Sequence, residues 1–241
     1  MPPVASGLVA FGIPAIALVV AVLWLVGLKR AQTRLGETGP RARRVLTFAV
    51  LGTVLWVALF SVAAYSGVLR RWDARPPPMV FMFIAIIGGG IALGLSPIGK
   101  RLAGGLSLAA LVGFQSFRFP LELVMHEAAR EHVMPVEMSF SGYNFDIVTG
   151  LSAIVVAAVA ALGSAPRWLV AAWNALGSAL LAAIAAVAFL SSPMVRAFGA
   201  GADHVNTWVT FFPYVLLPCV MVTAAVAGHV VVWRALGRAP A

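Results

Sequence analysis

Charged residues are scarce in this chain. Only 10% of its 241 residues are Asp, Glu, Lys or Arg, whereas 61% are hydrophobic. A soluble globular domain carries about a quarter charged residues, so the chain lacks the polar surface that a fold in water needs. Its apolar runs reach the length of about 20 residues that crosses a bilayer. The composition therefore predicts an all-α integral membrane protein, a polytopic bundle of transmembrane helices.

Cysteine and lysine are nearly absent. Cys219 is the single cysteine, which excludes an intrachain disulfide. The two lysines, Lys29 and Lys100, lie between apolar runs rather than within them. Because a retinal Schiff base needs an amine inside the membrane, the sequence argues against a retinal protein.

Acidic residues are outnumbered, with 8 Asp and Glu against 17 Lys and Arg and a net charge of +9. A basic chain can bind nucleic acid, but these basic residues lie in short segments and form no basic domain. Their arrangement is typical of loops at the cytoplasmic face of a membrane. We therefore expect the lipid bilayer as a partner, and no nucleic acid.

Seven apolar segments approach the length of a membrane-spanning helix. The connections between them are short, and none could house a soluble catalytic domain. The chain is therefore predicted to form one transmembrane domain over residues 1–241, with its function inside the bundle or at its rims. The segments run over residues 7–28, 46–69, 79–96, 106–128, 145–164, 168–190 and 208–233.

The basic residues also predict the orientation. With the N-terminus outside, 11 of them fall on the inner side and 5 on the outer side, as the positive-inside rule requires. We expect an outer N-terminus, a cytoplasmic C-terminus and a multi-pass protein of the cell inner (plasma) membrane. The inner residues are Lys29, Arg30, Arg34, Arg41, Arg43, Arg44, Lys100, Arg101, Arg167, Arg234 and Arg238, and the outer ones are Arg70, Arg71, Arg75, Arg130 and Arg196.

A polar stripe crosses the fourth segment. Arg118, Glu122 and His126 are spaced four residues apart, which places them on one helical face. Counted from Leu106, Arg118 lies roughly 18 Å and Glu122 roughly 24 Å into an apolar core about 30 Å thick. Charges at such depth face the bundle interior and seek partners, and the four-residue spacing predicts that Arg118 and Glu122 pair.

A second polar group opens the fifth segment. Asn144, Asp146 and Thr149 enter the membrane from the outer side, and Asp146 reaches a depth comparable to that of Glu122. We expect Arg118, Glu122 and Asp146 to form one cluster. One arginine with two carboxylates leaves a surplus negative charge unless one acid holds a proton, so the cluster could bind a cation or a proton, or only pin two helices together.

The seventh segment is broken by Pro213 and Pro218 and carries aromatic residues in its outer half. Broken helices occur where backbone lines a cavity. Tyr214 is therefore predicted to help wall a pocket beside the polar cluster.

Several residue types that bind metals fall near the outer face. The spacing HEAAREH matches no zinc-protease pattern, because histidines six residues apart leave a common helical face. We expect a solvated helix end and no metal site. A haem between His126 and His229 is disfavoured, because the two would lie at opposite membrane faces about 30 Å apart, and no cofactor is identified. The outer residues are His126, Glu127, Glu131, His132, Glu137, Asp203 and His204.

Small residues predict helix contacts. Gly90 and Gly94 in the third segment are spaced four residues apart, as are four alanines in the sixth. Such spacing lets helix backbones approach closely in a membrane. The alanines are Ala171, Ala175, Ala179 and Ala183.

Three patterns, FRxPxE at 117–122, GxNFDIxTG at 142–150 and FP…P…H from 212 to 229, resemble a family of small bacterial polytopic membrane proteins. The resemblance covers roughly the C-terminal half of the chain, and NFDIxTG is its most specific part. It implies no particular activity, and His126 lies outside the pattern. The residues that it singles out for testing are Arg118, Glu122, Asn144, Asp146 and His229.

Three functions stay open. The favoured one is a protein that binds or carries a small molecule, cation or proton among Arg118, Glu122 and Asp146. The second is an intramembrane enzyme that uses Glu122 or Asp146 as acid or base on a lipid-like substrate, although no nucleophile or metal triad is visible and no catalytic residue is identified. The third is a structural or assembly subunit, with a second copy or another membrane protein as partner.

The predicted orientation can be tested with single cysteines in intact cells. Cysteines at Arg41 and Arg101 should be shielded from a membrane-impermeant thiol reagent, because both positions lie on the predicted inner side. Cysteines at Asp73 and Asp203 should react. The reverse pattern of labelling would refute an outer N-terminus.

Overall fold

Helices account for all the regular secondary structure in the part of the chain that the computed structural model describes, residues 3–238. Short 3-10 turns join them, and no strand is present within that range. The helices are α1 (Gly7–Arg34), α2 (Gly39–Tyr65), α3 (Pro78–Leu95), α4 (Pro97–Gly105), α5 (Leu108–Phe114), α6 (Arg118–Arg130), α7 (Asp146–Ala161), α8 (Arg167–Leu190) and α9 (Thr223–Leu236), which the π-helix η6 (Leu217–Val222) precedes.

Within residues 3–238, six helical runs are long and apolar enough to cross a membrane, one fewer than the seven predicted. The coarser prediction of an all-α, multi-pass membrane protein is confirmed. The six runs are α1, α2, α3, α8, the run of α5 and α6 over Leu108–Arg130, and the run of η6 and α9 over Leu217–Leu236. The fifth predicted segment corresponds to α7, an apolar helix of 16 residues that is shorter than the others.

The prediction for the last segment was wrong at its start. A helix was expected from residue 208, but the continuous helical run begins at Leu217, after a 3-10 turn at Trp208–Thr210. Proline explains the shift, because a helix tolerates it only in the first turn, where its missing N–H is not needed. Pro218 occupies such a first-turn position in η6.

The fourth segment is also interrupted, close to Pro120. A 3-10 turn over Gln115–Phe117 separates α5 from α6, so that Pro120 falls in the first turn of α6. Arg118 is the first residue of α6. The interruption sits in the middle of a membrane-spanning run, next to the most polar side chains of the bundle.

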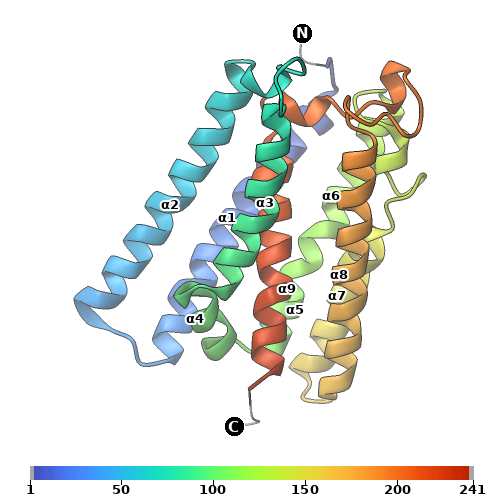
Figure 1. The fold of residues 1–241 in the computed structure, drawn as a ribbon. Helices are drawn as coiled ribbons and strands as arrows, with labels where there is room; N and C mark the ends of the chain where they lie inside the picture. Colours follow the sequence, from blue (N-terminus) through green and yellow to red (C-terminus); the bar gives the residue numbers. More distant parts are fainter. Residues whose placement is uncertain (1–2, 239–241) are drawn as a thin grey trace.

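The run of η6 and α9 is the axis of the bundle. It is the most buried of the six runs, and α9 contacts α1, α3, α4, α5 and α8. Figure 1 shows this run in red among the other helices, with the two ends of the chain at opposite ends of the bundle. Helix α2 leans away from the rest at its N-terminal end.

Glycine allows α3 to pack closely on α9. A Cβ at Gly94 would lie 2.6 Å from Val230 Cβ, and one at Gly90 would lie 2.7 Å from Val226 Cβ. The predicted contact through Gly90 and Gly94 is therefore present. The alanine repeat of the sixth segment makes no such contact, because Ala175, Ala179 and Ala183 of α8 are exposed.

Replacing Gly94 with alanine should destabilise the protein. The added methyl group would overlap Val230 and the carbonyl oxygen of Ala227, and such overpacking costs about 1–3 kcal/mol. Gly88→Ala on the same helix is the matched control, because its Cβ would meet nothing within 4 Å. Thermal unfolding in detergent should show a lower melting temperature for Gly94→Ala only; equal melting temperatures would contradict the close α3–α9 contact.

Candidate ligand-binding site

A buried ion pair joins α6 to α7. Arg118 Nε lies 2.7 Å from Asp146 Oδ2, and both side chains are almost fully buried. Asp146 is the first residue of α7, where the unpaired backbone N–H groups of the helix favour an anion. The pair therefore balances one charge with another inside the apolar bundle, where either charge alone would be costly.

The ion pair extends into α9 and α8 through a histidine. Arg118 Nη1 donates to His229 Nε2 at 2.9 Å, and His229 Nδ1 lies 2.8 Å from Asn174 Oδ1. Since arginine only donates, Nε2 must accept, and the proton of the neutral ring is then on Nδ1, donated to Asn174. Asn174 Nδ2 in turn donates a hydrogen bond to the backbone oxygen of His229 at 3.1 Å. Both ring nitrogens are thus engaged.

Glu122 has a different partner. Asn144 Nδ2 donates to both carboxylate oxygens of Glu122, at 2.9 and 2.8 Å, and lies 3.0 Å from the backbone oxygen of Met138. Asn144 Oδ1 accepts from the backbone N–H of Asp146 at 3.1 Å. The amide therefore holds Glu122 beside the start of α7 without supplying a positive charge.

Two glycines allow these helices to come so close. A Cβ at Gly150 would lie 2.3 Å from the backbone nitrogen of Phe119, so α7 packs directly on the first turn of α6. A Cβ at Gly177 would lie 2.6 Å from His229 Cε1 and 2.8 Å from Thr149 Cγ2. Gly150 stands one helical turn after Asp146, and Gly177 stands three residues after Asn174. Each glycine thus makes room beside a polar residue of the cluster.

An apolar cavity of about 100 Å³ lies against the polar cluster. Its walls come from α3, α6, α8 and η6, and Arg118, Glu122, Asn144 and Asp146 form its polar end. Six methionines contribute to its lining, and their flexible thioethers suit a cavity that must adapt to the shape of a ligand. The methionines are Met79, Met82, Met125, Met138, Met194 and Met221.

Hydrogen-bonding capacity remains unused at the polar end. Among the described residues, Arg118 Nη2, Asp146 Oδ1 and the hydroxyl of Thr149 are buried and have no hydrogen-bond partner within the criteria for such a bond. Arg118 Nη2 is a donor, Asp146 Oδ1 is an acceptor, and the hydroxyl can be either. Since buried polar atoms are nearly always bonded, these atoms have capacity for a water or a ligand.

The structure brings most of the predicted site residues together. Arg118, Glu122, Asn144 and Asp146 share one cavity end, and Thr149 lies beside His229. The expected cluster of Arg118, Glu122 and Asp146 is present, but Arg118 forms its ion pair with Asp146 of another helix and not with Glu122. The expected place of His229 near the inner face was wrong, since it bonds Arg118.

Two predicted residues lie elsewhere. Tyr214 is buried against Trp208, with ring centroids 5.2 Å apart, and is not brought to the cluster. His126 stacks on Phe140 with a centroid distance of 4.3 Å and bonds Ser141 at 3.1 Å, so it faces the connection between α6 and α7 rather than the cavity. The turn over residues 208–216, which replaces the expected helix, explains the displacement of Tyr214.

Sequence reasoning missed Asn174. It is fully buried in α8 and orients His229. An asparagine within an otherwise apolar span was the available signal, because polar side chains inside a membrane hydrogen-bond across helices.

The outer acids and histidines form separate pairs. His204 Nδ1 lies 2.5 Å from Glu137 Oε1, and His132 Nδ1 lies 3.7 Å from Asp203 Oδ1. No group of three or more His, Cys, Asp or Glu side chains with the geometry of a metal site occurs within residues 3–238.

The chain was compared with known protein families, with curated proteins and with solved structures, and none of these comparisons gave a match. The resemblance to a family of small bacterial membrane proteins stays a prediction.

The pairing of Arg118 can be tested with double-mutant cycles. Arg118→Leu and Asp146→Asn should each destabilise the protein by about 3–5 kcal/mol, because each strands a buried charged or polar partner. The double variant should cost less than the sum, whereas Arg118→Leu with Glu122→Gln should be closer to additive. Unfolding in detergent measures both cycles. A stronger coupling of Arg118 with Glu122 than with Asp146 would contradict the observed pairing.

Proposed function

We propose that this chain is a bacterial inner-membrane protein that binds a small molecule in the cavity beside Arg118, Glu122 and Asp146. The ligand has an apolar body and a polar end that both donates and accepts hydrogen bonds. We further propose seven membrane crossings, with α7 as the short one, an outer N-terminus and a cytoplasmic C-terminus.

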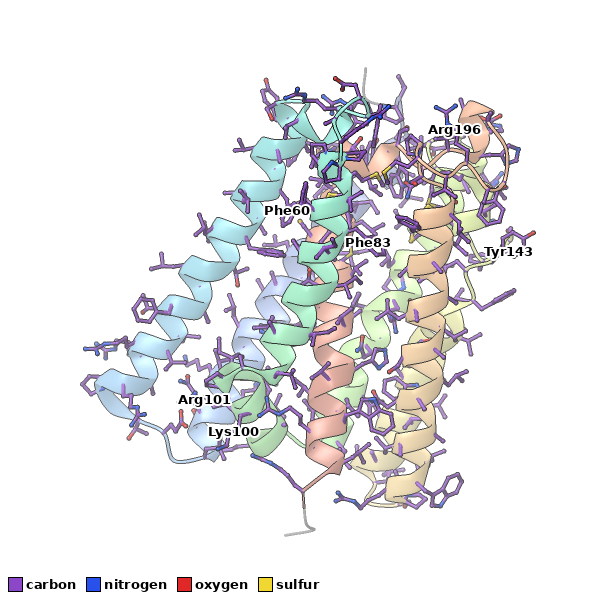
Figure 2. The ribbon with its side chains drawn as sticks, in the orientation of Figure 1. Phe60, Phe83, Lys100, Arg101, Tyr143 and Arg196 are labelled. Carbon is purple, nitrogen blue, oxygen red and sulfur yellow. The ribbon has the colours of Figure 1, made fainter. Side chains whose placement is uncertain are left out.

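The distribution of basic residues supports this orientation. Lys100 and Arg101 lie at one end of the bundle and Arg196 lies at the other (Figure 2). The end with Lys100 and Arg101 also holds the C-terminus (Figure 1). Because most basic residues of the sequence belong to connections at that end, the positive-inside rule favours it as the cytoplasmic one.

The unused donor and acceptor beside the cavity carry the proposal. A cluster that only fastened helices would be expected to satisfy its own atoms, since a half-satisfied buried network is destabilising. Arg118 Nη2 and Asp146 Oδ1 instead remain without partners next to an apolar cavity. A ligand that fills the cavity and bonds both atoms would remove that cost.

A cation or a proton is the second candidate, and Glu122 favours it. Its carboxylate bonds an amide, and the arginine pairs with Asp146. With both acids ionised, the three side chains carry one surplus negative charge. A cation bound by Glu122, or a proton on it, would make the cluster neutral.

The geometry favours an enzyme less. Both ring nitrogens of His229 are engaged, so the ring is not free to act as a general base. Cys219 is buried and lines a different cavity. The acids and the arginine suffice to hold a ligand, but within the described residues no activated nucleophile stands beside them.

Filling the cavity should abolish binding. Ala185 of α8 lines the cavity, and Ala185→Phe would place a ring there while leaving every polar side chain of the cluster unchanged. Ala186→Phe is the matched control, because Ala186 is exposed on the same helix. Native mass spectrometry of the protein released from membranes in mild detergent should show a discrete bound mass in the wild type and in Ala186→Phe, but not in Ala185→Phe.

Glu122→Gln separates the two candidates. For a hydrogen-bonded small molecule, the bound mass should remain in Glu122→Gln, because the ligand bonds Arg118 Nη2 and Asp146 Oδ1 whereas Glu122 bonds Asn144. If the ligand is a cation or a proton, the mass spectrum of the wild type should show no bound organic molecule. The wild type should instead bind a cation or a proton that Glu122→Gln does not bind. If the wild type binds neither an organic molecule nor a cation or proton, the cluster has only a structural role and the proposal is overturned.

A further inference from the structure

Helix α2 stands partly apart from the bundle. Of its 27 residues only Phe60 and Ala64, both in its C-terminal half, are buried. Its N-terminal half leans outward (Figure 1). The indole of Trp56 spans the gap between α2 and its neighbours, because its Nε1 donates to the backbone oxygen of Cys219 at 2.7 Å and its ring lies against Gly89.

The separation leaves an apolar cleft of about 260 Å³ between α2 and the facing helices α1, α3 and η6. This cleft, which we call the α2 cleft, is distinct from the cavity beside Arg118. Val20, Trp24, Ala49, Gly52 and Leu93 are among its lining residues. The space beside Gly52 is open, since a Cβ there would meet nothing within 4 Å.

The α2 cleft opens toward a basic rim. Phe48 lines both the cleft and a notch that also includes Arg43 and Arg44, and these two arginines are exposed. Across the cleft from α2, the lining residue Ile98 precedes Lys100 and Arg101 of α4 by two and three residues. Lys100 and Arg101 line a second notch at one end of the bundle (Figure 2).

We propose that the α2 cleft binds one anionic phospholipid, with an acyl chain between α2 and α3 and the phosphate at Arg43 and Arg44. The apolar walls suit the chain, and the basic rim supplies the opposite charge for the headgroup. The site is independent of the function proposed above. In the orientation given there, the lipid belongs to the cytoplasmic leaflet.

Charge also argues against a second copy of the chain as the occupant. Two copies inserted in the same direction bring their basic ends to the same side of the membrane. Their arginines would then face each other at the rim, and like charges so placed oppose association. An anionic lipid meets no such opposition.

The test compares phosphatidylglycerol with phosphatidylcholine, each titrated into the delipidated full chain and followed by native mass spectrometry. The wild type should bind phosphatidylglycerol about tenfold more tightly, given the two arginines at the rim. Arg43→Gln with Arg44→Gln should remove most of that preference, because it should weaken phosphatidylglycerol binding more than that of phosphatidylcholine, whose phosphate charge is offset by its own choline. Arg196→Gln at the other end is the control and should behave as the wild type.

Gly52→Phe tests the acyl chain. It should weaken the binding of both lipids by about tenfold or more, because the ring occupies the cleft. Gly88→Phe adds the same ring at an exposed position of α3 with open space and should leave binding unchanged. A melting temperature for each variant separates lost binding from lost folding.

Three results would overturn the proposal. The first is equal affinity of the wild type for the two lipids. The second is displacement of phosphatidylglycerol by millimolar inorganic phosphate, which would show that the rim binds phosphate without the acyl chain. The third is a wild-type dimer that Gly52→Phe converts to a monomer, which would identify a second copy as the occupant.

Discussion

An arginine inside an apolar helix bundle needs an opposite charge nearby, and the contacts of Arg118 connect the four helices α6, α7, α8 and α9. Its partner is Asp146, 2.7 Å away at the start of α7. That contact requires α6 and α7 to pack at Gly150, with almost no space between their backbones. Arg118 Nη1 reaches His229, which Asn174 holds in turn, so α9 and α8 join the same network.

The π-helix η6 lies between the two cavities of the molecule. Leu217, Pro218 and Met221 line the cavity beside the polar cluster, whereas Cys219 and Val220 line the α2 cleft. Because π-helical turns are rare and appear frequently at functional sites, this position fits the proposal of a ligand on one side and a lipid on the other.

Much of the candidate site could be predicted from the spacing of its residues. Arg118 and Glu122 lie on one helical face, and the entry of Asp146 from the same side of the membrane places it at similar depth. Their partners could not be predicted in the same way. Four-residue spacing favoured Glu122 for Arg118, but the guanidinium can satisfy its charge with any carboxylate that packing brings near, and α7 brings Asp146 closer.

The sequence by itself determined that the chain is helical and apolar, that its basic residues gather in connections, and that its few intramembrane charges must face one another. These follow from the cost of exposing polar groups to lipid, which depends on residue type and spacing along one helix. Only the tertiary structure decided the depth of His229 in the bundle, the outward tilt of α2, and the choice of Gly90 and Gly94 rather than the alanines of α8 as a close helix contact. These features depend on how each helix is rotated and shifted against its neighbours. Side-chain packing between segments distant in sequence sets that rotation and shift.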